Sequence, residues 1–248
     1  MRHLPVQVNW VAWAWRWCLL LAFCCTRLHA APAFEDSIAQ RTLACTGCHG
    51  AQGRAAPDGY YPRIAGKPAG YLLNQLRNFR DGRRHYALMA GLVDPLSDAY
   101  LQEIANYFAG LELPYPPPQP VALGDTEKKR GELLVTQGDV ARGIPACVSC
   151  HGQKLTGVVP HVPGLLGLPR DYVNAQLGAW KTGQRRAHAP DCMAHIAQQL
   201  GPDEVSAITG WLAAQALPTD THPAAAVPVR AAMAPACGSA PGLGGTAP

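Results

Sequence analysis

The feature that most constrains this chain is a pentapeptide that occurs twice. Cys45-Thr46-Gly47-Cys48-His49 recurs 102 positions later as Cys147-Val148-Ser149-Cys150-His151. Two thiols three positions apart, followed directly by an imidazole, form the attachment motif of c-type haem. The sulfurs bond the two vinyl groups of the porphyrin, and the histidine binds the iron. The repetition predicts two covalently bound haem c groups, attached through Cys45, Cys48, Cys147 and Cys150, with His49 and His151 as proximal ligands.

Zinc is the main alternative interpretation, because two Cys-x-x-Cys pairs can supply four thiolates. The two pairs here lie much farther apart than the pairs of a zinc ribbon, and a zinc site gives no reason for a histidine after each pair. A redox-active dithiol of the thioredoxin type requires a strand before the motif and a parallel sheet around it. The sequence shows no such pattern, so haem attachment is the favoured interpretation.

The N-terminal segment has the pattern of a secretory signal peptide. Two basic residues precede an apolar stretch from Trp10 to Cys25, and small residues close it near Ala30. We expect residues 1–30 to be cleaved off. Arg16 leaves too short an apolar stretch to span a bilayer, although an uncleaved anchor stays the alternative. Export predicts a periplasmic protein, in agreement with covalent haem attachment outside the bacterial cytoplasm.

The cysteine count and the net charge limit the remaining chemistry. Three of the nine cysteines lie in the predicted signal peptide and four in the haem motifs, which leaves Cys192 and Cys237. These two can pair in an oxidising compartment, and the sequence leaves open whether they do. The net charge of +4 is mild. No dense stripe of Lys and Arg predicts nucleic-acid binding.

The two halves match beyond their cysteines. Phe79 corresponds to Trp180, which keeps a large ring at that position. A fixed period indicates a duplicated structural unit. The two halves therefore use one fold twice. Seven residues of the first half recur in the second at a constant offset of 101: Pro62, Gly66, Pro68, Tyr71, Gln75, Leu76 and Gly82.

Each half is predicted to be all-helical. Apolar residues recur at helical spacing over Tyr71–Phe79, Asp98–Leu111, Tyr172–Trp180 and Pro202–Ala214. Shorter helices, Phe34–Ala44 and Thr126–Gln137, lead toward the two haem motifs. No convincing period-two stretch indicates a strand, so the predicted fold class is all-α.

Composition divides the chain into segments. Residues 34–113 form the predicted first domain, residues 114–123 a Pro-rich, semi-rigid linker, and residues 124–217 the second domain. Residues 218–248 contain almost no large apolar residues, so we expect a disordered tail. Each domain has a small protein core, which a buried porphyrin would largely fill. We therefore expect the protein without haem to be largely unfolded.

Met89 and Met193 are the predicted distal ligands of the two irons. They follow the motif histidines by 40 and 42 positions and occupy equivalent places in the two repeats. A thioether is a neutral, soft ligand that favours ferrous iron and raises the reduction potential relative to a second histidine. Filling a gap in the core is the alternative role for a methionine. The nearby His85, His188 and His195 are the alternative ligands.

Polar residues in the repeats have several possible roles. Tyr71 and Gln75 lie four positions apart on one helical face, as do Tyr172 and Gln176. We expect them to border the haem or the interface between the repeats, or to serve helix packing alone. Two arginine pairs precede the methionines and could neutralise haem propionates, form a docking patch or be solvated loop charges. These pairs are Arg83-Arg84 and Arg185-Arg186.

Together these motifs resemble those of the di-haem cytochrome c4 family of bacterial class I cytochromes c. The resemblance covers about residues 34–217 and includes the Pro…Gly…Tyr-x-x-x-Gln-Leu block, the Arg-Asp-Gly-Arg-Arg segment and the closing Leu-Ser-Asp helix. It implies two tandem class I cytochrome c domains that transfer single electrons in the periplasm. It also implies redox partners: a donor dehydrogenase or quinol-oxidising complex and an acceptor terminal oxidase. Cys192 directly before Met193 and the long tail depart from the family pattern.

The leading functional prediction is therefore an electron carrier that is not an enzyme. One histidine and one methionine on each iron leave no open position for a substrate. A cytochrome subunit of a periplasmic dehydrogenase or flavoprotein complex is the alternative. A di-haem peroxidase requires one exchangeable axial position, and this chain is shorter and more symmetric than that class of enzyme.

Overall fold

A computed structural model describes residues 35–56, 58–225 and 235–243. The predicted signal peptide lies outside the described residues. The described residues from Ser37 onward form one compact unit. Among the helices that are described, none has the length and apolar character needed to cross a membrane.

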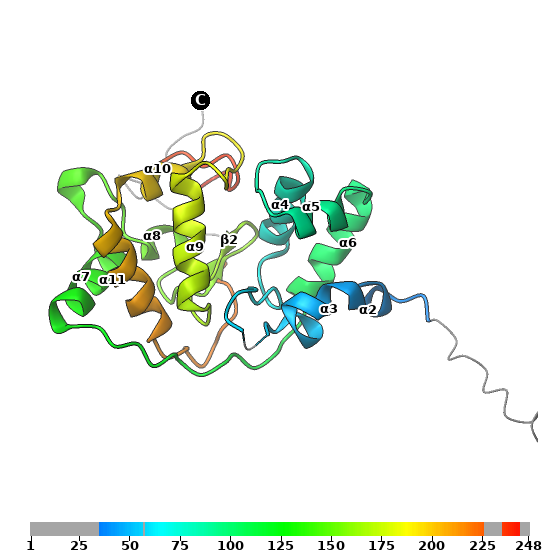
Figure 1. The fold of residues 1–248 in the computed structure, drawn as a ribbon, viewed down its shortest axis with the longest axis horizontal. Coiled ribbons are helices and arrows are strands. Elements are labelled where there is room, and N and C mark those ends of the chain that lie inside the picture. The colour runs from blue at the N-terminus through cyan, green and yellow to red at the C-terminus, as the bar shows by residue number, and fades with distance from the viewer. Residues whose placement is uncertain (1–34, 57, 226–234, 244–248) are drawn as a thin grey trace, which may run out of the picture. The chain divides into compact units, whose positions relative to one another are not determined.

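All the secondary-structure elements described in the first repeat are helices, joined by loops. The helix α4 packs against both α5 and α6, and α2 contacts α6 (Figure 1). The Ser97 hydroxyl caps α6 by accepting a hydrogen bond from the Tyr100 amide at 3.3 Å, which explains why this helix begins where the sequence predicts. The elements are α2 (Ile38–Arg41), α3 (Leu43–His49), the 3-10 helix η1 (Ala51–Gly53), α4 (Ala69–Arg80), α5 (Ala87–Val93) and α6 (Asp98–Ala109).

The second repeat follows the same plan with a small hairpin added. The helix α11 packs against α7 and α9, and α10 packs against α9. Glu204 accepts a hydrogen bond from the Gly201 amide at 3.0 Å and so helps to start α11. The elements are α7 (Asp125–Thr136), η2 (Val140–Arg142), α8 (Val148–His151), β1 (Gly157–Val158), β2 (Val162–Pro163), α9 (Arg170–Lys181), α10 (Cys192–Gln199) and α11 (Pro202–Ala213).

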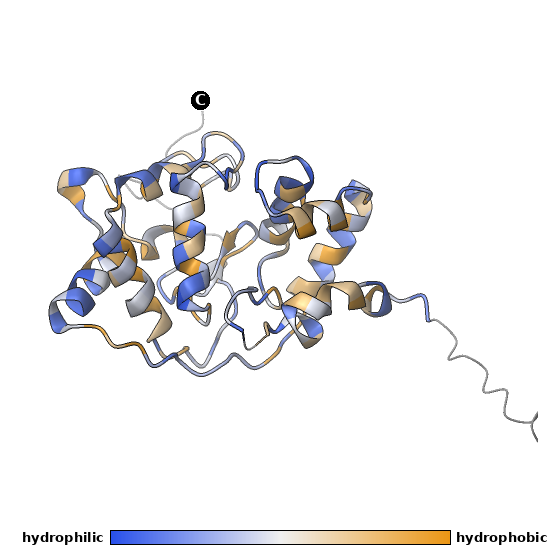
Figure 2. Cartoon of the chain, viewed as in Figure 1, coloured by the Kyte–Doolittle hydropathy of each residue, from blue (hydrophilic) through white to orange (hydrophobic). Residues whose placement is uncertain are grey.

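Each repeat has its own hydrophobic core, and the helices that build it carry hydrophobic and hydrophilic residues side by side (Figure 2). Each cluster is small, as expected for repeats of this size. The first cluster contains Leu72, Leu73, Phe79, Val93, Leu101, Ile104, Ala105 and Phe108. The second contains Leu134, Val135, Ile144, Leu155, Leu166, Leu200, Ile208 and Leu212.

The predicted fold class is confirmed, with local differences. The helix expected over Phe34–Ala44 is two short helices in its described part, and the second of them, α3, continues through the first haem motif to His49. The helices α5 and α10, which carry Met89 and Met193, were not predicted. The antiparallel hairpin β1–β2 was also missed, because each strand has two residues. Such short strands cannot display a period-two pattern.

Backbone contacts fasten the Pro-rich segment between the repeats. Arg63 donates to the Leu113 carbonyl at 2.6 Å and to the Pro114 carbonyl at 2.8 Å. Its guanidinium also lies over the Tyr115 ring, 3.9 Å from the centroid. Farther on, the Gln119 amide donates to the Ala213 carbonyl at 2.9 Å. The segment contains no helix or strand, and these contacts fix it near Pro114 and at Gln119.

The tail is ordered in two stretches, contrary to the disorder expected for residues 218–248. Ala224 extends the hairpin: its amide donates to the Gly157 carbonyl at 2.8 Å, and its carbonyl accepts from the Val159 amide at 2.9 Å. Farther along, a disulfide between Cys192 and Cys237 fixes the chain to the second repeat. The tail lacks large apolar side chains, and a crosslink and backbone hydrogen bonds hold it in place instead.

Candidate functional site

The two motif histidines are held in the same way. His49 ends α3 and its Nδ1 lies 2.9 Å from the Pro62 carbonyl, while His151 ends α8 and its Nδ1 lies 2.8 Å from the Pro163 carbonyl. A carbonyl only accepts hydrogen bonds, so Nδ1 carries the proton and Nε2 keeps a free lone pair. The recurring Pro62 and Pro163 were noted in the sequence, but their role in orienting the histidines was not foreseen.

Burial keeps both imidazoles neutral. His49 and His151 are each 8% exposed. Burial lowers the pKa of both side chains, and this effect is opposed by the hydrogen bonds to the two proline carbonyls. A neutral imidazole with a free Nε2 lone pair is the form that binds a metal ion. Each motif therefore presents one nitrogen donor.

A glycine after each histidine lets the chain turn back across the motif. Gly50 has a φ of +73°, and a Cβ there would lie 2.3 Å from the Ala55 carbonyl oxygen. Gly152 has a φ of +85°, and a Cβ there would lie 3.0 Å from the Gly157 oxygen. Positive φ strains any side-chain-bearing residue, so both positions require glycine. These glycines end the motif helices directly after the nitrogen donors.

The four motif cysteines are free thiols in this structure. Burial raises the pKa of Cys147 to about 12, and burial also raises the pKa of Cys45 and of Cys150. A reactive redox thiol requires the opposite shift. Across the described residues, no three His, Cys, Asp or Glu side chains come together in a way that could hold a metal ion. The geometry therefore supports neither a thioredoxin-like dithiol nor a shared zinc site.

The predicted distal methionines lie in equivalent helices. Met89 in α5 is half-buried against the core of the first repeat, and Met193 in α10 is also half-buried. The helix α5 packs on α4, as α10 packs on α9. Among the alternative ligands, His85 and His195 are exposed. The pairing of one methionine with each motif histidine stays a prediction.

A hollow of about 340 Å³ opens beside α5. Next to it, the Tyr86 hydroxyl lies 3.1 Å from the Tyr61 hydroxyl, and the Tyr61 ring meets the His49 ring edge to face at 6.1 Å between centroids. Sequence reasoning missed these tyrosines, because Val162 stands where the second repeat would need the counterpart of Tyr61. The hollow is lined by Phe79, Gly82, Arg84, His85, Tyr86, Ala87 and Ala90.

The recurring Tyr-x-x-x-Gln residues meet at the interface between the repeats. Arg84 donates to the Tyr172 hydroxyl at 3.1 Å and to the Gln176 side chain at 2.7 Å. In return, Arg185 donates to the Gln75 side chain at 3.0 Å. The interface is one of the roles expected for these residues, and the structure assigns them to it.

This interface concentrates positive charge. Arg185 is 6% exposed, and neither it nor Arg84 forms an ion pair within the described part of the chain. Their guanidiniums lie over Trp180 and Phe79. Burial raises the pKa of Tyr172, but the charges of the two arginines outweigh this effect and lower it overall. One buried and one half-buried cation, both with neutral partners, form a site suited to an anionic group.

Lys67 also crosses between the repeats. Lys67 is 4% exposed, and its ammonium donates to the Gly164 carbonyl at 2.9 Å, one residue after the carbonyl that orients His151. Burial, together with a smaller effect of the charge of Arg63, lowers the pKa of Lys67 to about 7. Sequence reasoning missed this contact, because the corresponding residue of the second repeat is Leu168 and no repeated pattern marks the position.

Each repeat therefore offers a donor set that fits a haem c. It combines a buried, neutral imidazole with a free Nε2 and two free thiols one helical turn apart, and the predicted distal methionine lies on a helix of the same repeat. The pair Arg84 and Arg185 suits the propionate carboxylates of such a group. A closed structural zinc site would need four such donors around one point.

Comparisons with known proteins support two covalently bound haem c groups. No family model matches the chain. The thiosulfate dehydrogenase electron acceptor of Thiomonas intermedia (strain K12) is 40% identical over 188 residues, which span 76% of this chain and 86% of that protein. Cytochrome c4 of Pseudomonas aeruginosa is 32% identical over 197 residues, 78% of this chain and 94% of the relative.

Solved structures show the same likeness. Reduced recombinant cytochrome c4 from Pseudomonas stutzeri has a TM-score of 0.59 and 29% identity, covering 70% of this chain and 94% of that one. The "as isolated" form of thiosulfate dehydrogenase from Marichromatium purpuratum has a TM-score of 0.61 and 32% identity. That match covers 70% of this chain and 36% of the longer protein.

Proposed function

Since the chain belongs to the di-haem cytochrome c4 family and is an electron-transfer cytochrome with two covalently bound haem c groups, we propose that it works in the periplasm between a dehydrogenase and a terminal oxidase. The predicted signal peptide supports export. Each haem, when bound, supplies a reversible one-electron change at its iron. The protein's part is to fix the ligands, exclude water and bring the two repeats together.

The proposed attachment sites are the four motif cysteines. Cys45 and Cys48 hold the first haem, and Cys147 and Cys150 hold the second. The observation that carries this assignment is the shared geometry of His49 and His151, whose Nδ1 atoms both donate to a proline carbonyl and leave Nε2 for iron. Such a bond fixes the tautomer and the ring orientation of a metal-binding histidine.

Met89 and Met193 are the proposed distal ligands, which leaves neither iron open to a substrate. Met89→Ala and Met193→Ala should each remove one methionine-to-ferric-iron charge-transfer band and lower one reduction potential without detaching haem. Spectra and a redox titration of the two variants test this. If neither substitution changes the spectrum or the potential, the ligand assignment is wrong.

Exchange of electrons between the repeats is proposed to use the interface around Arg84 and Arg185. Haem propionates turned toward this interface would meet the guanidiniums of Arg84 and Arg185, whose partners in the protein are uncharged side chains. Placing the propionates there would bring the edges of both porphyrins to the same boundary. A nearby positive charge also favours the reduced iron over the oxidised one.

We propose a thiosulfate-oxidising dehydrogenase as the electron donor. Two relatives, 40% and 38% identical to this chain, are each named a thiosulfate dehydrogenase electron acceptor. In addition, a solved thiosulfate dehydrogenase contains a region similar to this chain. Two haems can together take up the electrons of a two-electron oxidation, one at each iron.

A stopped-flow experiment tests the donor. The oxidised cytochrome is mixed with purified thiosulfate dehydrogenase and thiosulfate, and haem reduction is followed by absorbance. We expect reduction of both haems at a rate that depends on dehydrogenase concentration, and none when the dehydrogenase is omitted. Oxidised haems in the complete mixture, with a dehydrogenase that reduces another acceptor, would contradict this donor and leave the haem assignment standing.

A further inference from the structure

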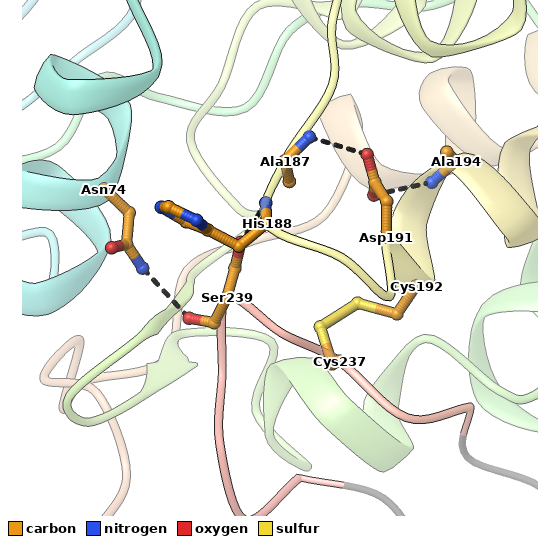
Figure 3. The surroundings of a disulfide bond; sticks show 8 residues. All are labelled: Asn74, Ala187, His188, Asp191, Cys192, Ala194, Cys237 and Ser239. Carbon is orange, nitrogen blue, oxygen red and sulfur yellow. Dashed lines mark hydrogen bonds between the residues drawn. A yellow bond between two sulfur atoms is a disulfide. The ribbon is translucent and has the colours of Figure 1, made fainter. Parts of the chain in front are cut away.

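The C-terminal residues 235–243, here called the strap, are fixed beside the second predicted methionine ligand. Cys237 in the strap forms a disulfide with Cys192, which is the first residue of α10 and directly precedes Met193 (Figure 3). The crosslink joins residues 45 positions apart. It therefore ties the end of the chain to the start of the helix that carries Met193.

Hydrogen bonds hold the strap against the loop before α10. The Gly238 amide donates to the Pro190 carbonyl at 2.9 Å, and the His188 amide donates to the Ser239 hydroxyl at 3.2 Å. A Cβ at position 238 would lie 2.2 Å from the Ala189 carbonyl oxygen. Only glycine permits so close an approach of the two backbones. The strap and the loop are thus packed backbone to backbone.

Asp191 links the loop before α10 to the first turn of that helix. Its carboxylate accepts hydrogen bonds from the Ala187 amide at 2.7 Å and from the Ala194 amide at 3.0 Å (Figure 3). The second of these bonds caps the N-terminus of α10. The first turn of this helix, which includes Met193, is therefore held both by the Asp191 cap and by the disulfide at Cys192.

The strap also packs against the hairpin that orients His151. Ala240 is 4% exposed and packs with Val158 and Val162 of the hairpin. The strand β2 also contains Pro163, whose carbonyl orients His151. One short segment thus connects the loop that carries the predicted distal ligand with the hairpin that orients the predicted proximal one.

A further contact extends the strap to the first repeat. The Asn74 side chain, on α4, donates to the Ser239 carbonyl at 2.9 Å. No matching crosslink is possible beside Met89, because Leu88 occupies the position that corresponds to Cys192. The strap therefore makes the two otherwise similar sites different.

We propose that the strap is a positioning element that keeps Met193 bound to the second haem iron. Release of the thioether requires the first turn of α10 to move, and the disulfide, the backbone bonds and the Asp191 cap oppose this motion. Crosslinks restrict the open states of a chain more than its closed ones. The second methionine is consequently harder to displace than Met89. This inference rests on the proposed ligation of both irons.

Displacement by imidazole measures this effect directly. The oxidised holoprotein is titrated with imidazole, and loss of the methionine-to-iron charge-transfer band is followed. A Met89→His background gives the first haem a strong protein ligand, so the titration reports the second haem alone. Removing the crosslink with the Cys192→Ser, Cys237→Ser double variant should lower the imidazole dissociation constant about tenfold.

Two further variants keep the test decisive. Ala236→Ser introduces a serine next to Cys237 and leaves the disulfide intact. The imidazole dissociation constant of this variant should therefore equal that of the Met89→His protein. Gly238→Ala keeps both cysteines but forces the strap away from Ala189. It should shift the dissociation constant in the same direction as the double variant, and it replaces that variant if the latter does not fold.

The outcomes separate this inference from the proposed function. An unchanged dissociation constant in the double variant or in Gly238→Ala, with the charge-transfer band present in both, would overturn the role of the strap and leave the ligation of Met193 intact. Absence of the band in the Met89→His parent itself would overturn the ligation and, with it, the inference.

Discussion

Arg84 and Arg185 face each other in an antiparallel backbone bridge between the two repeats. Each guanidinium bonds the glutamine of the opposite repeat, so Arg84 reaches Gln176 and Arg185 reaches Gln75. Adjacent backbone bonds extend the bridge, from the His85 amide to the Gln184 carbonyl at 2.8 Å and from the Arg186 amide to the Arg83 carbonyl at 2.7 Å. The duplicated sequence thus builds an interface of near two-fold symmetry.

Replacing Arg185 should weaken this interface. Arg185→Leu removes donors to Gln75, Gln176 and Tyr71 from a buried position, and we expect the free energy of unfolding to fall by about 2 kcal/mol. The neighbouring Arg186 is exposed and provides the matched control, since Arg186→Leu removes the same charge with an expected change below about 0.5 kcal/mol. Denaturant unfolding of the holoprotein measures both. Equal losses in the two variants would refute the role assigned to Arg185.

Gly50→Ala should destabilise the first site. The added methyl group meets the Ala55 carbonyl in a backbone of positive φ, and we expect a loss of about 3 kcal/mol together with a lower haem content. Gly82→Ala isolates the conformational cost, because its φ is +69° and no atom lies within 4 Å of the added carbon. That variant should lose about 1 kcal/mol. Thermal unfolding compares the two, and a Gly82→Ala loss as large as that of Gly50→Ala would contradict the steric argument.

Lys67 should make stability depend on pH. The folded lysine loses its proton near pH 7, whereas its ordinary pKa is 10.5. Between these values the unfolded chain binds more protons than the folded one, so stability rises with pH in this window. Below pH 7 both states are protonated and the penalty of the buried charge is constant.

Lys67→Leu removes this penalty and restores the residue found at the equivalent position of the second repeat. The difference in unfolding free energy between the unsubstituted protein and this variant should be flat below pH 7 and then shift in favour of the unsubstituted protein up to about pH 10. Denaturant unfolding across this range gives the comparison. A difference that does not change with pH would show that Lys67 keeps its ordinary pKa.

The sequence predicted those features that repeat or that have fixed spacing. The helix expected over Tyr71–Phe79 is Ala69–Arg80 in the structure, and the helix expected over Pro202–Ala214 is Pro202–Ala213. Start signals and helical periodicity are local properties of the chain, so they can be read without the fold. The haem motifs are equally local, since covalent attachment requires neighbouring thiols.

Features that depend on distant parts of the chain could not be predicted in the same way. Lys67 and Tyr61 have no counterpart in the second repeat, so the duplication did not mark them. The pairing of Cys192 with Cys237 depends on where the tail lies, and the sequence therefore left it open. The order of the strap also follows from this crosslink and from contacts with the hairpin, which the small residues of the tail do not indicate.

Intact-mass spectrometry of the mature, denatured protein tests the central claim most directly. After expression with a working haem-maturation system, the polypeptide should carry the added mass of two haem groups, and the Cys147→Ala, Cys150→Ala double variant should carry one. A polypeptide without bound haem, or one that contains zinc in place of iron, would contradict the account.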